Sequence, residues 1–241
     1  MSELLHGKTI LITGGARRVG RIFALACARA GADVMIHYGH AKEEAEKTVS
    51  EVTDLGRRAW MFQADLSDPS QAEKVIPHIN ESMPLHGLVN SAAIFEVREL
   101  ENTSLEDWQK HLAINLTAPF LLSQAFARQA SEGARIVNIL DWRALRPHGD
   151  HFPYTISKAA LAAMTKSLAV ALAPKVIVNG LALGAILPPA GSVASPAILK
   201  NVPAGRWAEA KEVEQALLFT LTGPAYITGE IIHLDGGRHL I

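Results

Sequence analysis

Hydrophobic positions along the chain follow two alternating patterns: short runs of consecutive apolar residues, and longer segments with helical spacing. The short runs predict seven strands, at Lys8–Thr13, Asp33–His37, Ala59–Gln63, Gly87–Asn90, Arg135–Ile139, Val176–Leu181 and Glu230–Leu234. Most of these runs are hydrophobic at nearly every position, which is typical of strands buried on both faces in a parallel sheet.

The helical segments lie between these strands. They are predicted at Val19–Ala30, Lys42–Leu55, Ser70–Glu81, Leu105–Ala130, Tyr154–Leu172 and Ala210–Leu221. Pro119 allows a bend or a break in the longest of them. Strands that alternate with helices predict an α/β fold, with one doubly wound parallel sheet of about seven strands and helices on both faces. We therefore expect residues 1–241 to form a single domain.

The segment 184–205 fits neither pattern. It contains four prolines and shows little periodicity. A loop of this length inside a compact domain usually has a function, so we expect this segment to close over a substrate.

Composition narrows the class of protein further. The chain has 241 residues, 49% of them hydrophobic, and a formal net charge of -1. This length is sufficient for one large core, and the balanced charge predicts neither a nucleic-acid nor a membrane partner. The single cysteine, Cys27, excludes an intrachain disulfide. Without an apolar stretch of the ~20 residues that span a bilayer, we expect a cytoplasmic protein, and we predict no metal site.

A glycine-rich sequence, T-G-G-A-R-R-V-G, follows the first predicted strand and leads directly into a helix. Small residues let the backbone approach a pyrophosphate closely, and the start of the helix supplies unpaired N–H groups and the positive end of a dipole. This placement indicates a dinucleotide site. The residues predicted to form it are Gly14, Arg17, Arg18, Val19 and Gly20.

The end of the second predicted strand reads H-Y-G-H, from His37 to His40. Enzymes that bind NAD in this way usually carry an acidic residue here, which binds the ribose hydroxyls. In its absence, a 2′-phosphate would meet Arg17, Arg18 and His40 without a repelling carboxylate. The sequence therefore predicts NADPH rather than NADH as the cofactor.

A Y-x-x-x-K motif places Tyr154 and Lys158 on one face of a predicted helix. A free phenol has a pKa near ~10 and is a poor acid or base at neutral pH. We expect the ammonium group of Lys158 to lower the pKa of Tyr154 toward the working range. The pair is thus predicted to donate the proton in a reduction.

Taken together, the glycine loop and the Y-x-x-x-K motif resemble the short-chain dehydrogenase/reductase family over essentially the whole chain. The resemblance implies a Rossmann-like fold. It also implies a catalytic tetrad of Asn115, Asp141, Tyr154 and Lys158, in which Asp141 stands where the family usually has serine. Further cofactor contacts are implied for Tyr38, Asp65, Leu66, Asn90, Ala92, Gly184 and Ile186, in addition to Tyr154 and Lys158.

Within the family, two substitutions resemble the pteridine and dihydromonapterin reductases: Arg18 in place of a glycine and Asp141 in place of a serine. Phe95 also matches. This implies hydride transfer to a C=N bond of a dihydropterin, of the dihydrobiopterin, dihydromonapterin or dihydrofolate type, with Asp141 and Tyr154 delivering the proton. Phe95 would stack on the pterin, and Arg18 would contact both cofactor phosphate and substrate. The resemblance also implies a homotetramer and makes Arg238 a candidate to reach a neighbouring subunit's site.

Two other functions stay open at this point. Trp142 and Arg143 follow Asp141 where small residues are commoner, so the sequence admits more than one class of substrate. One alternative is a carbonyl reductase of the same fold, acting on a 3-oxoacyl thioester or a small ketone. The other is a sensor that binds NADP without turnover, against which the intact Tyr154 and Lys158 pair speaks.

Overall fold

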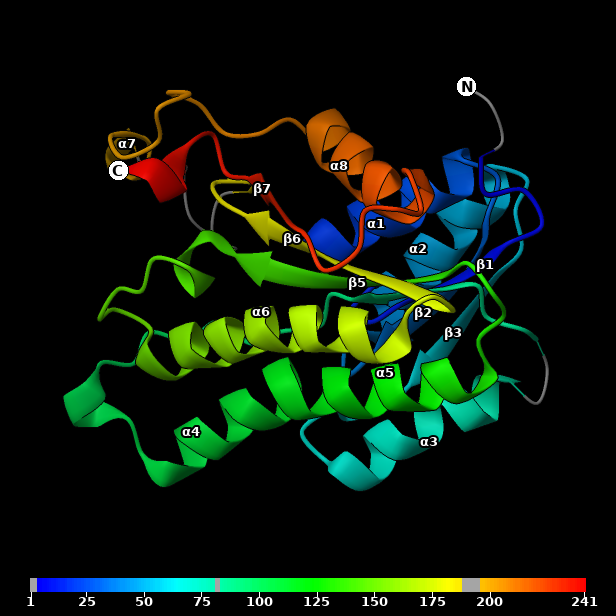
Figure 1. Ribbon diagram of the computed structural model, residues 1–241, viewed down its shortest axis with the longest axis horizontal. Helices are drawn as coiled ribbons and strands as arrows, with labels where there is room; N and C mark the ends of the chain where they lie inside the picture. The colour runs from blue at the N-terminus through cyan, green and yellow to red at the C-terminus, as the bar shows by residue number, and fades with distance from the viewer. Residues whose placement is uncertain (1–3, 81–82, 188–195) are drawn as a thin grey trace.

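A single parallel sheet forms the centre of the computed structural model, which describes residues 4–80, 83–187 and 196–241. Its strand order is β3-β2-β1-β4-β5-β6-β7, and every neighbouring pair is parallel (Figure 1). The predicted α/β fold is therefore confirmed. The strands are β1 (Thr9–Ile12), β2 (Asp33–Tyr38), β3 (Ala59–Gln63), β4 (Gly87–Asn90), β5 (Ala134–Asp141), β6 (Val176–Leu183) and β7 (Ile231–Leu234).

Helices cover both faces of this sheet. Figure 1 shows α1, α2 and α8 above the sheet and α3, α4, α5 and α6 below it. Their bounds are α1 (Arg18–Arg29), α2 (Lys42–Asp54), α3 (Pro69–Asn80), α4 (Leu105–Leu112), α5 (Ala118–Gln129), α6 (Phe152–Leu172), α7 (Pro196–Leu199) and α8 (Ala210–Thr222). Four short helical turns lie between or after these elements: η1 (Leu100–Asn102), η2 (Ala113–Thr117), η3 (Trp142–Ala144) and η4 (Arg238–Leu240).

The hydrophobic core is divided by the sheet into two layers. Successive side chains of a strand point to opposite faces, so Ile10 and Ile12 pack with Phe23 of α1, whereas Leu11 packs with Phe126 of α5. All five side chains are almost completely buried. Each face of the sheet is thus fixed by its own layer of helices, which holds the strand ends in place.

One predicted helix differs from the structure in its interior. The run from α4 to α5 is continuous, but η2 between them is a π-helical turn. Pro119 lies just after this turn. A proline lacks an N–H and clashes with the carbonyl group four residues earlier, and a widened turn relieves the clash without ending the helix. The predicted bend or break is therefore a π turn, and Asn115 lies within it.

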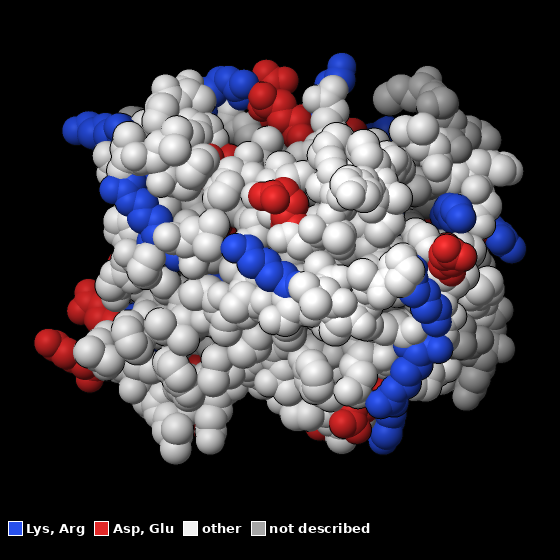
Figure 2. Space-filling view, viewed as in Figure 1, with Lys and Arg blue, Asp and Glu red and all other residues white. Residues whose placement is uncertain are grey.

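Helix α6 has the length and apolar composition of a membrane-spanning segment. It packs, however, against β5 and β6, and it carries the buried residues Tyr154 and Lys158. These contacts mark α6 as a helix of the α/β core. On the face seen in Figure 2, charged side chains of both signs are scattered and form no large basic surface.

Within the segment 184–205, the structure describes residues 184–187 and 196–205, including the short helix α7. Residues 188–195 lie outside the described part of the chain. Closure of this segment over a substrate stays a prediction.

Candidate active site

The residues predicted to carry the chemistry meet where the parallel strands end. Asp141 is the last residue of β5, and Tyr154 and Lys158 lie in the first two turns of α6. The glycine loop follows β1, whose neighbour in the sheet is β4. Ligands of open α/β sheets bind at this carboxyl edge, and the fold brings the two predicted motifs to it.

The Tyr154 hydroxyl donates a hydrogen bond to Oδ2 of Asp141 over 3.1 Å. Oδ1 of Asp141 accepts a hydrogen bond of 2.9 Å from the backbone N–H of Arg143. Burial raises the pKa of Asp141. Burial, together with the charge of Asp141, raises the pKa of Tyr154 well above its ordinary value. The phenol is thus an acid held in its protonated form beside a carboxyl group.

The expected effect of Lys158 on Tyr154 is wrong for this structure. The ammonium group donates a hydrogen bond of 2.7 Å to the carbonyl oxygen of Ile139 and lies 5.9 Å from the centre of the Tyr154 ring. Because burial and Asp141 both favour the neutral phenol, they prevail over the attraction of a more distant ammonium. Burial also lowers the pKa of Lys158, to about 8.

Asn115 lies close to the pair but is bonded to other groups. Its side-chain oxygen accepts from the backbone N–H of Ile94 over 3.0 Å, and its side-chain nitrogen donates to the Ile94 carbonyl over 3.1 Å. The same nitrogen lies 3.1 Å from Oγ of Ser157, whose hydroxyl donates to the carbonyl oxygen of Tyr154 over 2.7 Å. Asn115 is thus placed to position Tyr154 through Ser157. Ser157 was missed because its only signal was its place inside the Y-x-x-x-K motif.

Phe95 forms an aromatic wall beside the Tyr154 phenol. Their ring centres lie 4.7 Å apart in a T-shaped contact, and Phe95 is 52% exposed. His151 stacks on Phe95 with ring centres 3.9 Å apart and an angle of 14°. His151 has a φ of 134°, which is uncommon for a residue with a side chain and recurs at active sites. His151 was not among the predicted site residues, because its backbone conformation is invisible in the sequence.

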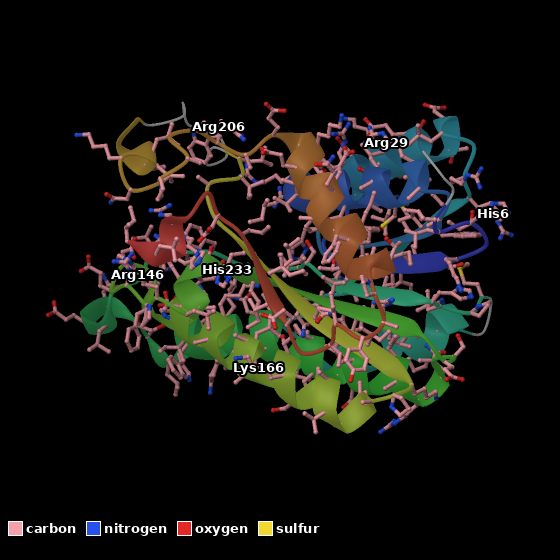
Figure 3. All side chains as sticks on the ribbon, turned by 45° about the horizontal axis from the view of Figure 1, so that its top comes forward. His6, Arg29, Arg146, Lys166, Arg206 and His233 are labelled. Atoms are coloured by element: carbon pink, nitrogen blue, oxygen red, sulfur yellow. The ribbon has the colours of Figure 1, made fainter. Side chains whose placement is uncertain are left out.

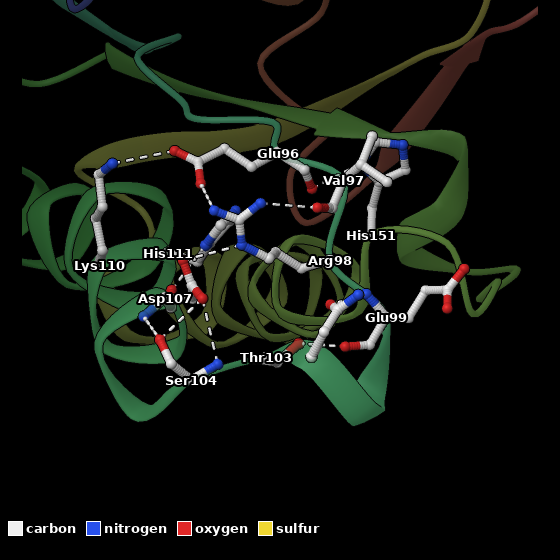
Figure 4. Close-up of polar contacts among 11 residues, drawn as sticks. Glu96, Val97, Arg98, Glu99, Thr103, Ser104, Asp107, Lys110, His111 and His151 are labelled. Atoms are coloured by element: carbon white, nitrogen blue, oxygen red, sulfur yellow. Dashed lines mark hydrogen bonds and ion pairs between the residues drawn. The ribbon is translucent and has the colours of Figure 1, made fainter.

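Ion pairs tie the segment after Phe95 to α4, as Figure 4 shows. The Arg98 guanidinium lies 3.2 Å from Glu96 and 3.0 Å from Asp107 of α4. Lys110, one turn further along α4, donates to Glu96 over 3.0 Å. Exposed pairs are individually worth little, but this network joins α4 to the segment that carries Phe95.

The glycine loop has the shape that a pyrophosphate needs. Gly14 has a φ of 64°, and a Cβ there would lie 2.9 Å from Cα of Ala92. A Cβ at Gly20 would overlap the carbonyl oxygen of Gly14. The Thr13 hydroxyl accepts the N–H groups of Ser91 and Ala92 over 2.9 and 3.0 Å. Only glycine fits at these two positions, so the residues present suit a closely bound dinucleotide.

The basic residues predicted for a 2′-phosphate are on the surface beside this loop. Arg17 and Arg18 are exposed at the start of α1, where Val19 is half-buried, and His40 is exposed after β2. Arg18 has a φ of 52°, an uncommon conformation for a residue with a side chain. Two guanidinium groups and an imidazole therefore lie at this edge of the site, where an anionic group could bind.

His37, one residue from the end of β2, supports the glycine loop from beneath. Its Nδ1 accepts the N–H of Gly14 over 3.2 Å, and its Nε2 lies 3.0 Å from the carbonyl oxygen of Ala64. These partners fix a neutral imidazole with the proton on Nε2. Burial lowers the pKa of His37 to about 4. A polar residue in a buried strand was the only sequence signal for this role.

The remaining predicted cofactor positions are mostly buried or closely packed. Tyr38, Leu66 and Ile186 are buried, and a Cβ at Gly184 would lie 2.6 Å from Asp235. Asp65 accepts hydrogen bonds from the backbone N–H and the hydroxyl of Ser67, and these bonds lower the pKa of Asp65.

Asn90, by contrast, faces the core. Its side-chain nitrogen donates to Oδ1 of Asn138 over 2.8 Å and lies 3.3 Å from Oγ of Ser123. Its side chain therefore braces β4 against β5 and α5, and the structure does not bring it to the glycine loop.

The Arg238 side chain packs against its own chain rather than extending away from it. Its guanidinium lies 4.2 Å from the ring centre of Trp142, the residue after Asp141. The position expected to serve a neighbouring subunit is thus already next to the site of the same chain. Among the residues that the structure describes, no group of three or more His, Cys, Asp or Glu side chains has the arrangement of a metal site.

Comparisons with known proteins agree with this geometry. A family model described as enoyl-(acyl carrier protein) reductase matches residues 14–239. The 3-oxoacyl-[acyl-carrier-protein] reductase FabG of Aquifex aeolicus is 35% identical over 247 residues, which cover 98% of this chain and 99% of that protein.

Solved structures show the same likeness. A short-chain dehydrogenase from Burkholderia cenocepacia in complex with NADP superposes with a TM-score of 0.92 at 35% identity, over 97% of this chain and 98% of that one. FolM alternative dihydrofolate reductase 1 from Brucella suis, also in complex with NADP, gives a TM-score of 0.89 at 31% identity, over 97% and 96%. With its glycine loop, its Tyr154 and Lys158 pair and matches over nearly its whole length, the chain belongs to the short-chain dehydrogenase/reductase family.

Proposed function

We propose that this protein is an NADPH-dependent reductase that reduces a C=N bond of a dihydropterin to the tetrahydro form. The observation that carries the proposal is the hydrogen bond of 3.1 Å from the Tyr154 hydroxyl to Asp141, with the exposed Phe95 ring beside it. A protonated phenol hydrogen-bonded to a carboxyl group whose pKa is raised by burial suits delivery of a proton to a ring nitrogen. Phe95 offers a flat heteroaromatic ring an aromatic contact.

NADPH as the cofactor is supported by residues of this chain. Gly14 and Gly20 leave room for a pyrophosphate, and the exposed Arg17, Arg18 and His40 suit a 2′-phosphate. The solved structures from Burkholderia and Brucella contain NADP. When bound, this cofactor supplies the hydride that the substrate carbon accepts.

The residues of the chain supply the proton that completes the reduction. As the C=N carbon receives hydride, its nitrogen takes a proton from the Tyr154 hydroxyl, and the hydrogen bond to Asp141 orients that hydroxyl. The phenolate left behind regains its proton through Asp141, whose pKa is raised by burial. Ser157 and Asn115 hold the start of α6 in place for this transfer.

A second candidate function is reduction of the keto group of a 3-oxoacyl thioester to a hydroxyl group. The 35% identity with the Aquifex aeolicus 3-oxoacyl-[acyl-carrier-protein] reductase favours it. In that reaction a hydroxyl donor to the carbonyl oxygen would suffice, and a buried carboxyl group beside Tyr154 would have no special task.

The oxidation of NADPH with a dihydropterin, dihydrofolate and a 3-oxoacyl thioester separates the two functions. We expect turnover of the pterins and little of the thioester. In Asp141→Ser, pterin reduction should fall by ~10²–10⁴-fold, the usual worth of a general acid, while thioester reduction should not fall. Reduction of the thioester alone by the unchanged protein would transfer the assignment to the carbonyl-reductase class.

We also propose that the protein acts as a homo-oligomer in the cytoplasm. Large apolar side chains are exposed on α5 and α6, at Phe120, Ile156 and Val170, and a contact between subunits would cover them. Sedimentation equilibrium would test this, with a tetramer expected and a monomer contradicting it.

A further inference from the structure

Next to the proton-donating pair lies a cluster of arginines around one buried indole. Trp142 follows Asp141 and is 3% exposed. The Arg143 guanidinium lies 4.8 Å from the centre of its ring, and the Arg238 guanidinium lies 4.2 Å from it. Because guanidinium groups are attracted to aromatic faces, the buried Trp142 ring holds two positively charged groups close together.

Arg146 adds a third guanidinium. It donates a hydrogen bond of 3.4 Å to the carbonyl oxygen of Arg238. Figure 3 shows Arg146 beside the C-terminal turn η4, which contains Arg238. The loop after β5 and the end of the chain are thus joined by the residues that carry these charges.

The carboxyl groups near Arg146 and Arg238 contact other groups, and two of them, Asp150 and Asp141, lie 3.0 and 3.9 Å from Arg143. Asp150 accepts from Arg143 over 3.0 Å, and Asp235 accepts from His239 over 2.8 Å. Asp141 accepts from the Tyr154 hydroxyl. In the described part of the chain, no carboxylate lies within ion-pair distance of Arg146 or Arg238.

Two further observations indicate that these guanidinium groups lack part of their compensation. Burial, and next the charge of Arg143, lower the pKa of Arg238, and together they outweigh the opposing charges of Asp141, Asp150 and Asp235. The buried Nε atoms of Arg143 and Arg238 have no hydrogen-bond partner. Buried donors without acceptors are costly, and an anion at this place would relieve both effects.

The cluster is within reach of a ligand that lies on Phe95. The Arg143 guanidinium is 5.6 Å from the Phe95 ring centre and 4.8 Å from that of Trp142. The arginines therefore begin directly beyond the aromatic wall next to Tyr154, where the side chain of a bound ring would lie.

We propose that Arg146 and Arg238, held beside Trp142, bind an anionic group on the side chain of the substrate. This inference rests on the proposed function and names its substrate class: a dihydropterin with a carboxylate tail, as in dihydrofolate, rather than one with an uncharged side chain. Paired guanidinium groups recognise carboxylates by charge and by parallel hydrogen bonds.

The test compares two substrates on the intact protein. The kcat/KM values for dihydrofolate and dihydrobiopterin are measured with NADPH for the unchanged protein, Arg146→Gln, Arg238→Gln and Arg238→Lys. We expect the ratio of dihydrofolate to dihydrobiopterin to fall about 10- to 100-fold in each Gln variant, the usual worth of a hydrogen bond to a charged group. Arg238→Lys should keep part of the preference because it keeps the charge.

Arg128→Gln is the matched control. Arg128 lies near the end of α5, which leads into the start of β5 at the opposite edge of the sheet, and its guanidinium donates to Gln124. This variant should leave the ratio as it is. A ratio that stays within twofold in both Arg146→Gln and Arg238→Gln would overturn the inference while leaving pterin reduction in place.

A binding measurement keeps the inference separate from the proposed function. p-Aminobenzoyl-glutamate is titrated calorimetrically into the NADP-loaded protein. We expect binding that weakens with salt, as screened charge pairs do, and that is lost in Arg238→Gln. If no pterin is reduced, the proposed function fails, and this titration alone decides the anion site. Equal binding by both proteins, or none by either, would overturn it.

Discussion

The two sides of the site are built from different materials. On the side of the glycine loop, backbone groups and residues without side chains shape the surface, and neutral His37 and Thr13 hold it in place. On the side of Asp141, buried charged and aromatic groups do so, among them Tyr154 and Trp142. The first arrangement suits a ligand common to a whole family. The second can vary with the substrate, but it keeps charged groups in a buried environment that disfavours their charge.

The largest effect should come from removing the phenolic proton. In Tyr154→Phe, the ring keeps its packing against Phe95 and only the hydroxyl is lost. We expect the rate of reduction to fall by about 10²–10⁴-fold, with little change in the affinity for NADPH. Steady-state kinetics and cofactor titration would measure this, and a variant that retains more than a tenth of the rate would exclude Tyr154 as the acid.

On the other side of the site, the corresponding change is Gly20→Ala. Its Cβ would overlap the Gly14 carbonyl oxygen, and because both groups belong to the backbone, the loop has to shift. Overpacking of this kind costs about 1–3 kcal/mol, so we expect NADPH to bind roughly 10- to 100-fold more weakly. Gly149→Ala is the control, because a Cβ there meets nothing within 4 Å and its φ is not positive. Unchanged cofactor affinity in Gly20→Ala would show that the loop is not shaped by close approach.

A third prediction concerns the stability that His37 gives to the glycine loop. Its pKa is about 4 in the folded chain against the ordinary 6.5, so the unfolded chain binds a proton first as the pH falls. Its contribution to stability is complete above pH ~6.5 and is lost between pH ~6.5 and ~4.

Between pH 7.5 and pH 5, we therefore expect the free energy of unfolding to fall by about 2 kcal/mol because of this residue. Denaturant unfolding at the two pH values, for the unchanged protein and His37→Gln, isolates the effect. The same pH dependence in both proteins would refute the role of His37.

The smallest effect concerns the aromatic wall. Phe95→Leu removes the T-shaped contact with Tyr154 and the stack on His151 while keeping an apolar side chain. An aromatic pair is worth about 0.5–1.5 kcal/mol, so we expect KM for a dihydropterin to rise about two- to tenfold. The KM for NADPH serves as the internal control. A KM for the pterin that does not change would indicate that Phe95 packs only within the protein.

The sequence predicts the framework better than the contacts within it. Seven strands and their alternation with helices were predictable because buried strands have continuous hydrophobic runs. The sequence ended the fifth strand at Ile139, but β5 extends through Leu140 to Asp141, where the hydrophobic run ends in a charged residue of the site. The partners of His37 come from Gly14 and Ala64, which only the fold brings together.

The sequence predicts that Lys158 lowers the pKa of Tyr154, but the structure raises it, because the contacts that decide this pKa are also set by the fold. Four-residue spacing places Tyr154 and Lys158 on one face of a helix, but spacing alone contains neither burial nor the Ile139 carbonyl that accepts the ammonium. The π turn around Asn115 likewise depends on how the helix adapts to Pro119.

The most direct test of the central claim follows a labelled hydride. The protein is supplied with a dihydropterin and with NADPH carrying deuterium at the transferable C4 position of the nicotinamide, and the product is examined by mass spectrometry. We predict a tetrahydropterin that contains one deuterium, formed by the unchanged protein and nearly absent with Tyr154→Phe. Consumption of NADPH without a deuterated pterin would contradict the account.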